Sequence, residues 1–283
     1  MKILIIQENG RHEKNRHFRE CYSLQRSFEK LEHEVTVWGL GHDNFEIQPD
    51  YHSYDLIFNL ENYAHTSGDW LPDLSDISAL KLLWAIDTHC LGEEIFENYR
   101  QAGKYDFILH SVKDFVTKDY HLWFPNSFDD SLIKPLDIDT KYDIGFCGNY
   151  ANRKDLLEWL SHRHGLRLDI FVIGDDMVEA VNSYGCHFNM NMAWNINSAI
   201  NYRNFETIGC GTLLLTSHSL EYKELGFEDG VNCLIYSNIG ELEEKIDFVK
   251  KNDVGQIKQA GLELSKLHTY DKRVQALLRE LKL

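Results

Sequence analysis

The chain has 283 residues, 43% of them hydrophobic and 26% charged, and is therefore long enough for two domains that each bury a core. Its formal net charge of −16 argues against a broad surface for duplex nucleic acid, because binding a phosphate backbone requires concentrated lysine and arginine. This charge does not exclude a local basic pocket.

In the first half, short apolar runs alternate with amphipathic segments, which is typical of βαβ units and a parallel sheet. A stripe of Phe18, Tyr22, Phe28 and Leu31 predicts a helix after the first strand, and GEEIFENYRQAG predicts another before Tyr105. Strands are predicted over residues 2–6, 34–40, 54–60, 81–86 and 105–111.

The segment 125–141, PNSFDDSLIKPLDIDTK, is acidic and rich in turn-forming residues, which indicates a linker. The alternation then resumes, and the C-terminal residues indicate helix only. Strands are predicted over residues 142–148, 168–174, 186–192, 212–217 and 232–237. We therefore predict an α/β fold of two Rossmann-like, doubly wound domains facing across a cleft, with ligands beyond the carboxyl ends of the strands.

The stretch NYRNFETIGCGTLLLT, residues 201–216, reads as a short helix that starts near Asn201 or Arg203 and leads into a buried strand. The N-terminus of such a helix attracts phosphate oxygens, and Arg203 would add a charged donor. Glu206, in the first turn or so, could accept both hydroxyls of a ribose. Alternatively, Glu206 only complements the helix dipole, and spacing alone leaves both interpretations open.

In the first half, WAIDTHC (84–90) leaves Asp87 and His89 at the carboxyl end of a strand, where either could be a general base. Asp87 could instead be a helix N-cap or a turn residue. Glu61 is similarly placed after the third strand and is a weaker candidate. The loop 10–20, GRHEKNRHFRE, is locally basic and would either meet anionic groups or be a solvated loop.

No metal site is indicated, because His162 and His164 lack the H-E-x-x-H spacing and the Asp137-x-Asp139 pair falls in the linker. Neither a P-loop nor a G-x-G-x-x-G after the first strand is present, which removes the main support for an ATPase or a dehydrogenase. No apolar run approaches the ~20 residues of a membrane span. Six cysteines without a C-x-x-C pair favour free thiols in a reducing compartment, so a cytoplasmic protein is predicted.

Several pieces of the second half, in this order, resemble the CgeB-like (spore-maturation) family of glycosyltransferases, which belong to the two-Rossmann-domain GT-B class. The resemblance covers about residues 105 to 281. Its pieces are LHSVKDF (109–115), PNSFDDSLIKP (125–135), YDIGFCGNYANRKDLLEWL (142–160), NYRNFETIGCGTLLLT (201–216), GFEDGVNCLIYSNIGELEEKI (226–246) and HTYDKRVQALL (268–278).

The resemblance implies an N-terminal acceptor domain over 1–137, a nucleotide-sugar donor domain over 138–267, and a helix over 268–283 that packs back on the first domain. It implies that Glu206 holds the ribose of a UDP- or GDP-type donor, with Arg203 and the helix start at Asn201 beside it. The other residues that it places near the donor are Gly148, Asn149 and Arg153 at the diphosphate and Gly174 and Asp175 at the base.

Two points qualify this transfer. Arg153 could instead be an exposed residue of a first helical turn. Where related GT-B enzymes carry a second acid eight positions before Glu206, this chain has Ser198, which leaves the binding of the donor sugar open.

The expected function is therefore transfer of a sugar from a nucleoside-diphosphate donor to an unknown acceptor hydroxyl, without a metal or another cofactor. Phosphate would be held by a helix dipole and basic side chains. Two alternatives remain: a DNA-modifying, phage-type glucosyltransferase, which the acidic charge disfavours, and a nucleotide-sugar-binding protein without catalysis, which Ser198 suggests.

Overall fold

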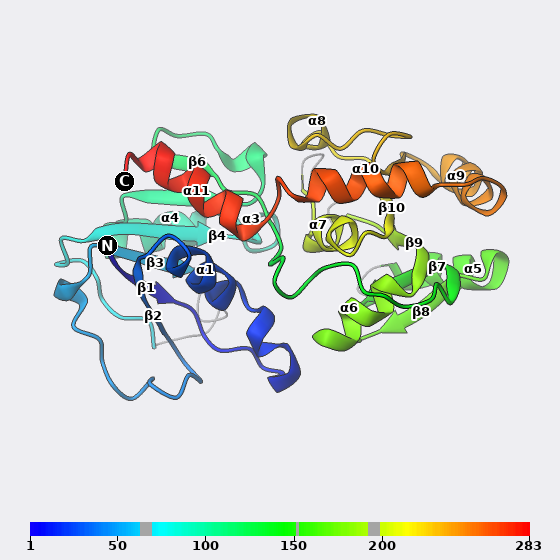
Figure 1. The fold of residues 1–283 in the computed structure, drawn as a ribbon. Coiled ribbons are helices and arrows are strands. Elements are labelled where there is room, and N and C mark those ends of the chain that lie inside the picture. The colour runs from blue at the N-terminus through cyan, green and yellow to red at the C-terminus, as the bar shows by residue number, and fades with distance from the viewer. Residues whose placement is uncertain (63–69, 151–152, 192–198) are drawn as a thin grey trace. The chain divides into compact units, whose positions relative to one another are not determined.

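The computed structural model describes residues 1–62, 70–150, 153–191 and 199–283. The chain divides into two compact units, of which the first joins Met1–Asn126 with Tyr270–Leu283 and the second is Ser127–Thr269 (Figure 1). Each unit contains one parallel β-sheet with helices, as the alternating pattern predicts.

The first unit is built on a six-stranded sheet in the order β2-β1-β3-β4-β5-β6, in which all neighbouring strands are parallel. Its inner strands are mostly apolar, because helices and loops cover both faces of a parallel sheet. The strands are β1 (Lys2–Ile6), β2 (Glu34–Trp38), β3 (Leu56–Leu60), β4 (Leu80–Ala85), β5 (Phe107–His110) and β6 (His121–Trp123). The edge strand β6 was not predicted, since three residues are too few to show a period.

The helices of this unit include the predicted pair after β1 and before β5. They are η1 (Glu13–Phe18), α1 (Glu20–Glu29), η2 (Tyr51–Ser53), α3 (Thr88–Leu91), α4 (Glu93–Gly103), η3 (Lys113–Phe115) and the C-terminal α11 (Tyr270–Leu281). Helix α11 packs along α1, where Asp271 accepts a hydrogen bond from Ser27 Oγ (2.7 Å) and pairs with Lys30 (2.7 Å).

The second unit contains a five-stranded parallel sheet in the order β11-β10-β9-β7-β8. Its strands are β7 (Tyr142–Gly148), β8 (Arg167–Ile170), β9 (Tyr184–Asn189), β10 (Leu213–Ser217) and β11 (Leu234–Tyr236). Its helices are α5 (Lys154–His164), α6 (Asp175–Asn182), α7 (Tyr202–Gly209), α8 (Tyr222–Leu225), α9 (Ile239–Lys251) and α10 (Gly255–Ser265). All five predicted strands are present.

Strand β8 ends at Ile170, earlier than predicted, because Phe171 takes a left-handed conformation (φ 58°) and its side chain is 72% exposed. The predicted linker 125–141 is also only partly a linker. Phe128 is buried and lies against Gly209, where a Cβ atom would come within 2.6 Å of its ring, and Ile133 is buried as well. Residues 134–141 are exposed.

Both sheets follow the doubly wound strand order 2-1-3-4-5, with β6 added at one edge of the first. In such sheets the chain leaves the first strand and its later neighbour in opposite directions, which opens a crevice at their carboxyl ends. These positions are the ends of β1 and β3 in the first unit and of β7 and β9 in the second. Across the described parts of the chain, no helix combines the length and the hydropathy needed to span a membrane.

Candidate functional site

The carboxyl ends of β9 and β10 are joined to the start of α7 by a buried network of amide and hydroxyl groups. Asn204 is its centre and is fully buried. Its Oδ1 accepts from the Tyr222 hydroxyl (2.8 Å) and its Nδ2 donates to Asn191 Oδ1 (2.9 Å). Asn201 precedes the helix but does not cap it; its Nδ2 donates to Asn189 Oδ1 (3.1 Å). These asparagines therefore fix the start of α7 on the sheet.

Glu206 forms an ion pair with Arg203, one turn earlier on α7. The Glu206 side chain is 13% exposed and that of Arg203 is 24% exposed, so the pair is neither buried completely nor free in solvent. Burial alone would lower the pKa of Arg203, but the Glu206 carboxylate more than offsets it and the pKa is raised. Arg203 Nε also donates to the carbonyl oxygen of Cys147, near the end of β7 (3.1 Å).

This pairing uses Glu206 Oε2 and Arg203 NH1 and leaves Glu206 Oε1 and Arg203 NH2 without a hydrogen bond to other described residues. The two side chains thus present a carboxylate oxygen and a guanidinium donor side by side. Such a combination suits a ligand that carries both hydroxyl and phosphate groups.

His187, on β9, supports the Arg203–Glu206 pair indirectly, through Cys147 and Thr207. The Cys147 amide donates to His187 Nε2 (3.1 Å), which leaves the Nδ1 proton to be donated to Thr207 Oγ1 (2.6 Å). Burial, with a smaller contribution from the Arg203 charge, lowers the pKa of His187 to about 3, so the ring is neutral at physiological pH. Cys147 is therefore held by His187 at its amide and by Arg203 at its carbonyl.

Arg153, immediately before α5, is a buried cation without a carboxylate partner in the described chain. It is 8% exposed; NH1 donates to the Met190 carbonyl (2.9 Å), and the guanidinium lies 5.5 Å from the Phe146 ring centroid. Its Nε is buried and makes no hydrogen bond to a described residue. Burial lowers the pKa of Arg153. The alternative of an exposed first-turn arginine is therefore wrong.

The other predicted donor-site residues are dispersed along the same edge. Gly148 ends β7 and Asn149 follows it with an exposed side chain, while Asp175 begins α6 and is also exposed. Gly174, before α6, takes φ 65°. Ser198 lies outside the described residues. The roles expected for these residues stay predictions.

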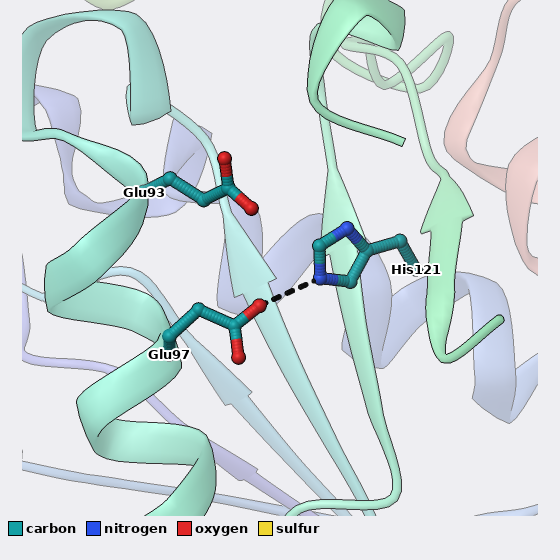
Figure 2. A group of neighbouring side chains, drawn as sticks. All are labelled: Glu93, Glu97 and His121. Carbon is teal, nitrogen blue, oxygen red and sulfur yellow. Dashed lines mark hydrogen bonds and ion pairs between the residues drawn. The ribbon is translucent and has the colours of Figure 1, made fainter. Parts of the chain in front are cut away.

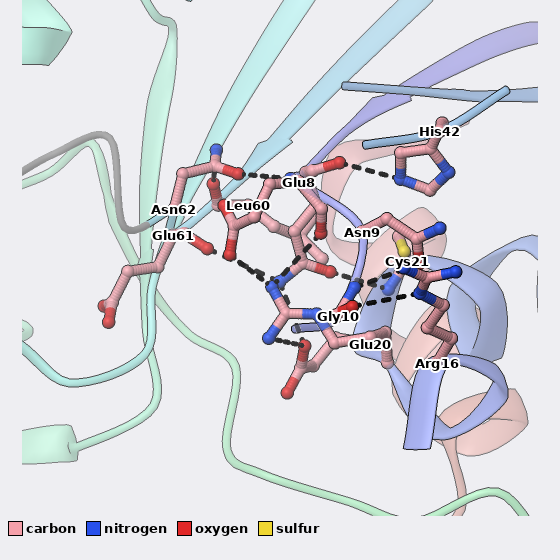
Figure 3. A network of polar contacts seen from close by, with 12 residues as sticks. Glu8, Asn9, Gly10, Arg16, Glu20, Cys21, His42, Leu60, Glu61 and Asn62 are labelled. Atoms are coloured by element: carbon pink, nitrogen blue, oxygen red, sulfur yellow. Dashed lines mark hydrogen bonds and ion pairs between the residues drawn. The ribbon is translucent and has the colours of Figure 1, made fainter. Parts of the chain in front are cut away.

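In the first unit, a polar network joins the carboxyl ends of β1 and β3 to the start of α1 (Figure 3). Arg19 pairs with Glu8 (2.7 Å), and Gln7 Nε2 donates to Glu20 (2.9 Å). The Glu8 amide donates to Asn62 Oδ1 (2.8 Å). The locally basic loop 10–20 thus directs Arg19 at acidic side chains of its own unit.

Glu61 joins this network through its carbonyl oxygen, and its side chain points away from the network (Figure 3). Glu61 Oε2 accepts hydrogen bonds from the amides of Ile86 and Asp87, both at 2.7 Å, where β4 leads into α3. Burial, and then the neighbouring Asp87 charge, raise the pKa of Glu61 to about 8.

Asp87 occupies the N-cap position of α3, but its side chain makes no capping hydrogen bond. Its carboxylate is solvent-accessible, although the surrounding protein excludes enough water to raise its pKa, with His89 acting in the opposite direction. His89 is half-buried, and its Nδ1 is buried without a hydrogen-bond partner within the described residues. The structure therefore brings Glu61, Asp87 and His89 together at the end of β4, with Asp87 the accessible acid.

Glu93, Glu97 and His121 form a group whose ligand atoms lie within 4.8 Å of one another (Figure 2). His121 Nε2 lies 2.9 Å from Glu97 Oε1, and Lys118 binds Glu97 and lies 3.3 Å from Glu93 Oε1. The Lys118 ammonium lies between the two carboxylates and offsets one of their two negative charges. It ties α4 to β6.

Residues 131–279 match the glycosyl transferase-like family, which is more than half of the chain. The chain belongs to this family. A search of curated proteins finds no match.

Solved structures with the same fold include glycosyltransferases of low sequence identity. The Anabaena protein HepE, solved with UDP and glucose, has a TM-score of 0.66 at 12% identity, covering 100% of this chain and 99% of that one. A DNA-modifying β-glucosyltransferase has a TM-score of 0.66 at 11% identity, with both chains covered completely. Sucrose-phosphate synthase from Thermosynechococcus elongatus has a TM-score of 0.63 at 10% identity, covering 99% and 98%. The predicted GT-B fold is confirmed.

Two features of this glycosyl transferase-like chain were missed by sequence reasoning. Nothing in the sequence shows that Asn204 binds groups from β9, β10 and α8. His187 lies in an apolar strand, and its two contacts come from segments forty residues before it and twenty after it. Only the fold brings these partners together.

Proposed function

We propose that the chain transfers a sugar from a uridine-diphosphate donor to an acceptor hydroxyl, with the second unit binding the donor. The observation that supports this most directly is Arg153, a buried cation that no described carboxylate neutralises. Leaving a charge buried and unpaired is costly, so such a group favours an anionic ligand. The diphosphate of the donor is an anion of suitable chemistry.

The Arg203–Glu206 pair completes the donor site in this proposal. Arg203 NH2 donates to phosphate oxygens, which gain negative charge as the bond to the sugar breaks. Glu206 Oε1 accepts from a ribose hydroxyl. Gly148 and Asn149 approach the diphosphate, and Asp175 lies toward the base. UDP is favoured over GDP because HepE, with the same fold, was solved with UDP.

Asp87 is the general base of this proposal. Its carboxylate is accessible and makes no hydrogen bond to a described residue, and its raised pKa brings its basicity closer to that needed at neutral pH. The acceptor O–H bond breaks with its proton passing to Asp87. The oxygen bonds to the sugar carbon, and the electron pair of the broken C–O bond leaves with UDP.

The acceptor is inferred to be something other than nucleic acid. Four acids, Glu8, Glu20, Glu61 and Asp87, follow or adjoin the carboxyl ends of β1, β3 and β4. A phosphate backbone would meet the exposed Asp87 and an overall charge of −16. DNA is therefore the second candidate, despite the DNA-modifying neighbour of the same fold.

The remaining expectations belong to the same proposal. The ordered pieces around 201–216 favour the CgeB-like branch of the family. Catalysis is proposed to need no metal or other cofactor, because Arg153 and Arg203 can supply the positive charge at the diphosphate. A cytoplasmic location also stays part of the proposal.

Calorimetric titration with UDP tests the donor site, using Arg153→Met and Glu206→Ala. Arg163→Met is the matched control, because Arg163 is exposed on α5 and pairs with Glu243. We expect UDP to bind the wild type and Arg163→Met equally and both site variants at least tenfold more weakly. Equal UDP affinity of all four proteins would exclude the proposed donor site.

Release of UDP from UDP-glucose tests catalysis. We expect slow hydrolysis by the wild type and none by Asp87→Asn, whereas a protein that only binds the donor would show no hydrolysis at all. A gel shift with duplex DNA at low salt tests the second candidate, for which we expect no retarded band.

A further inference from the structure

The turn between β4 and α3, which carries Asp87, is held by a different acid. Glu61 Oε2 accepts from two consecutive amides, those of Ile86 and Asp87, at 2.7 Å each. The Asp87 carboxylate makes no capping bond. Glu61 thus holds the two peptide amides that lead into α3, and the Asp87 side chain makes no hydrogen bond to a described residue.

The charges that face Glu61 are mostly negative. Asp87 and Glu20 both raise its pKa, while Arg19 pairs with Glu8 and lies 3.6 Å from Glu20. Cys90, on α3, has its own thiol pKa raised by burial and by Asp87 and Glu61. His89 is the cationic candidate on α3, and it acts on Asp87. No described Lys, Arg or His forms an ion pair with Glu61.

The two oxygens of Glu61 differ in their surroundings. Oε2 accepts both amide hydrogens, whereas Oε1 has no hydrogen-bond partner among the residues described. A proton on Oε1 therefore disturbs neither of the bonds that Oε2 makes. Burial and the neighbouring Asp87 raise the pKa of Glu61 to about 8, which agrees with a carboxyl group that keeps this proton at neutral pH.

We propose that Glu61 is a positioning residue for the Asp87 base: it holds the Asp87 peptide through Oε2 and keeps a proton on Oε1, so that the pair carries one negative charge on Asp87. This inference rests on the proposed function, since it assumes that Asp87 is the base. Glu61 keeps its proton throughout transfer, and the acceptor proton goes to Asp87.

Loss of the Glu61 proton places a second negative charge beside Asp87, and the repulsion between the two carboxylates pushes Asp87 from the position that it holds beside a neutral Glu61. We therefore expect kcat of the wild type to fall above about pH 8. Glu61→Gln keeps an amide oxygen for the two amide donors and cannot ionise, so its kcat at pH 7 stays within about threefold of the wild type and does not fall at higher pH.

Transfer or donor hydrolysis is measured from pH 6 to pH 9.5 for the wild type, Glu61→Gln, Glu61→Ala and the control Glu94→Gln, an exposed acid of α4. Glu61→Ala loses the support of the turn, so we expect a kcat at least tenfold lower with an unchanged KM for UDP-glucose. Glu94→Gln should keep the alkaline fall of the wild type. An alkaline fall that persists in Glu61→Gln overturns the inference.

A second measurement needs no substrate. Because the pKa of Glu61 is raised above its unfolded value, the unfolded chain loses this proton first as pH rises, and the folded state loses stability between about pH 4.5 and pH 8. Glu61→Gln does not lose stability in this way. The melting temperature of Glu61→Gln minus that of the wild type should therefore increase from pH 5 to pH 9. A constant difference overturns the proton-holding role.

The two proposals fail separately. If Asp87→Asn keeps its activity, Asp87 is not the base and the proposed mechanism fails. The stability measurement then still tests whether Glu61 holds a proton. An inactive Asp87→Asn together with Glu61 variants that behave like the wild type overturns only the positioning role.

Discussion

Replacing Arg153 by methionine should weaken nucleotide binding without destabilising the unliganded protein. Methionine keeps the apolar part of the side chain and removes a guanidinium that makes one hydrogen bond to the described residues, to the Met190 carbonyl at 2.9 Å. That hydrogen bond contributes about 1.5 to 3 kcal/mol, and the contact with Phe146 about 0.5 to 2 kcal/mol. Met190 would still accept from Asn201 Nδ2 at 3.2 Å, so no carbonyl is left without a donor.

Burying a guanidinium that no described carboxylate neutralises carries a penalty of several kcal/mol per ion, which acts against this loss. The net expectation is a change in unfolding free energy between zero and about 2 kcal/mol of stabilisation. Removing one partner of a buried ion pair would instead cost about 3 to 5 kcal/mol. The sign of the change in unfolding free energy therefore distinguishes an arginine that binds an anionic ligand from an arginine in an internal ion pair.

Urea unfolding of the unliganded wild type and Arg153→Met measures this difference, and calorimetry with UDP measures the binding loss, expected at about 30- to 100-fold for one charged hydrogen bond. Arg163→Met again serves as the surface control. The reasoning is refuted by a variant that is destabilised by 3 kcal/mol or more and binds UDP as the wild type does.

Three further predictions concern the second unit. Glu206→Ala should remove a preference for UDP over 2′-deoxy-UDP that the wild type shows in calorimetry, because the ribose hydroxyls lose their acceptor; a wild type without this preference contradicts the ribose role. Asn204→Ala should lower the unfolding free energy by about 3 kcal/mol or more in urea, since several buried groups lose a partner, whereas the exposed Asn149→Ala should change it by less than about 0.5 kcal/mol. His187 has a pKa depressed to about 3, so the unfolded chain binds a proton first as pH falls below about 6.5 and the folded state is destabilised; His187→Gln should reduce the fall in melting temperature between pH 7 and pH 5, and an unchanged fall would argue against a buried neutral ring.

Much of the fold was predictable because parallel strands buried on both faces read as continuous apolar runs. The run KILII became β1, in which four of the five residues are buried, and YDIGFCG became β7 with the predicted bounds. The stretch 201–216 was also recognisable, because a short helix followed by an apolar run is a pattern of residues close along the chain.

The site itself depended on which strands are neighbours. Periodicity in the sequence predicts strands but does not determine their order, and the order decides which carboxyl ends meet. Glu61 and Asp87 are joined because β3 pairs with β4, and Cys147 meets His187 because β7 pairs with β9. The sequence alone could not show that Glu61 holds the turn between β4 and α3 and that Asp87 stays accessible.

Charge compensation was likewise decided only in three dimensions. Glu206 was expected either to bind a ribose or to complement the helix dipole, and its ion pair with Arg203 was not predicted. The sequence offered no signal for Arg153 either, because the lack of a carboxylate partner among the described residues depends on which side chains the fold brings near it. The sequence by itself determined most of the strands and the short helix that begins near residue 202, since each arises from residues close along the chain. The tertiary structure decided that Arg153 is buried beside the Met190 carbonyl and that Glu61 supports Asp87, since burial and long-range hydrogen bonds exist only once the sheets have formed.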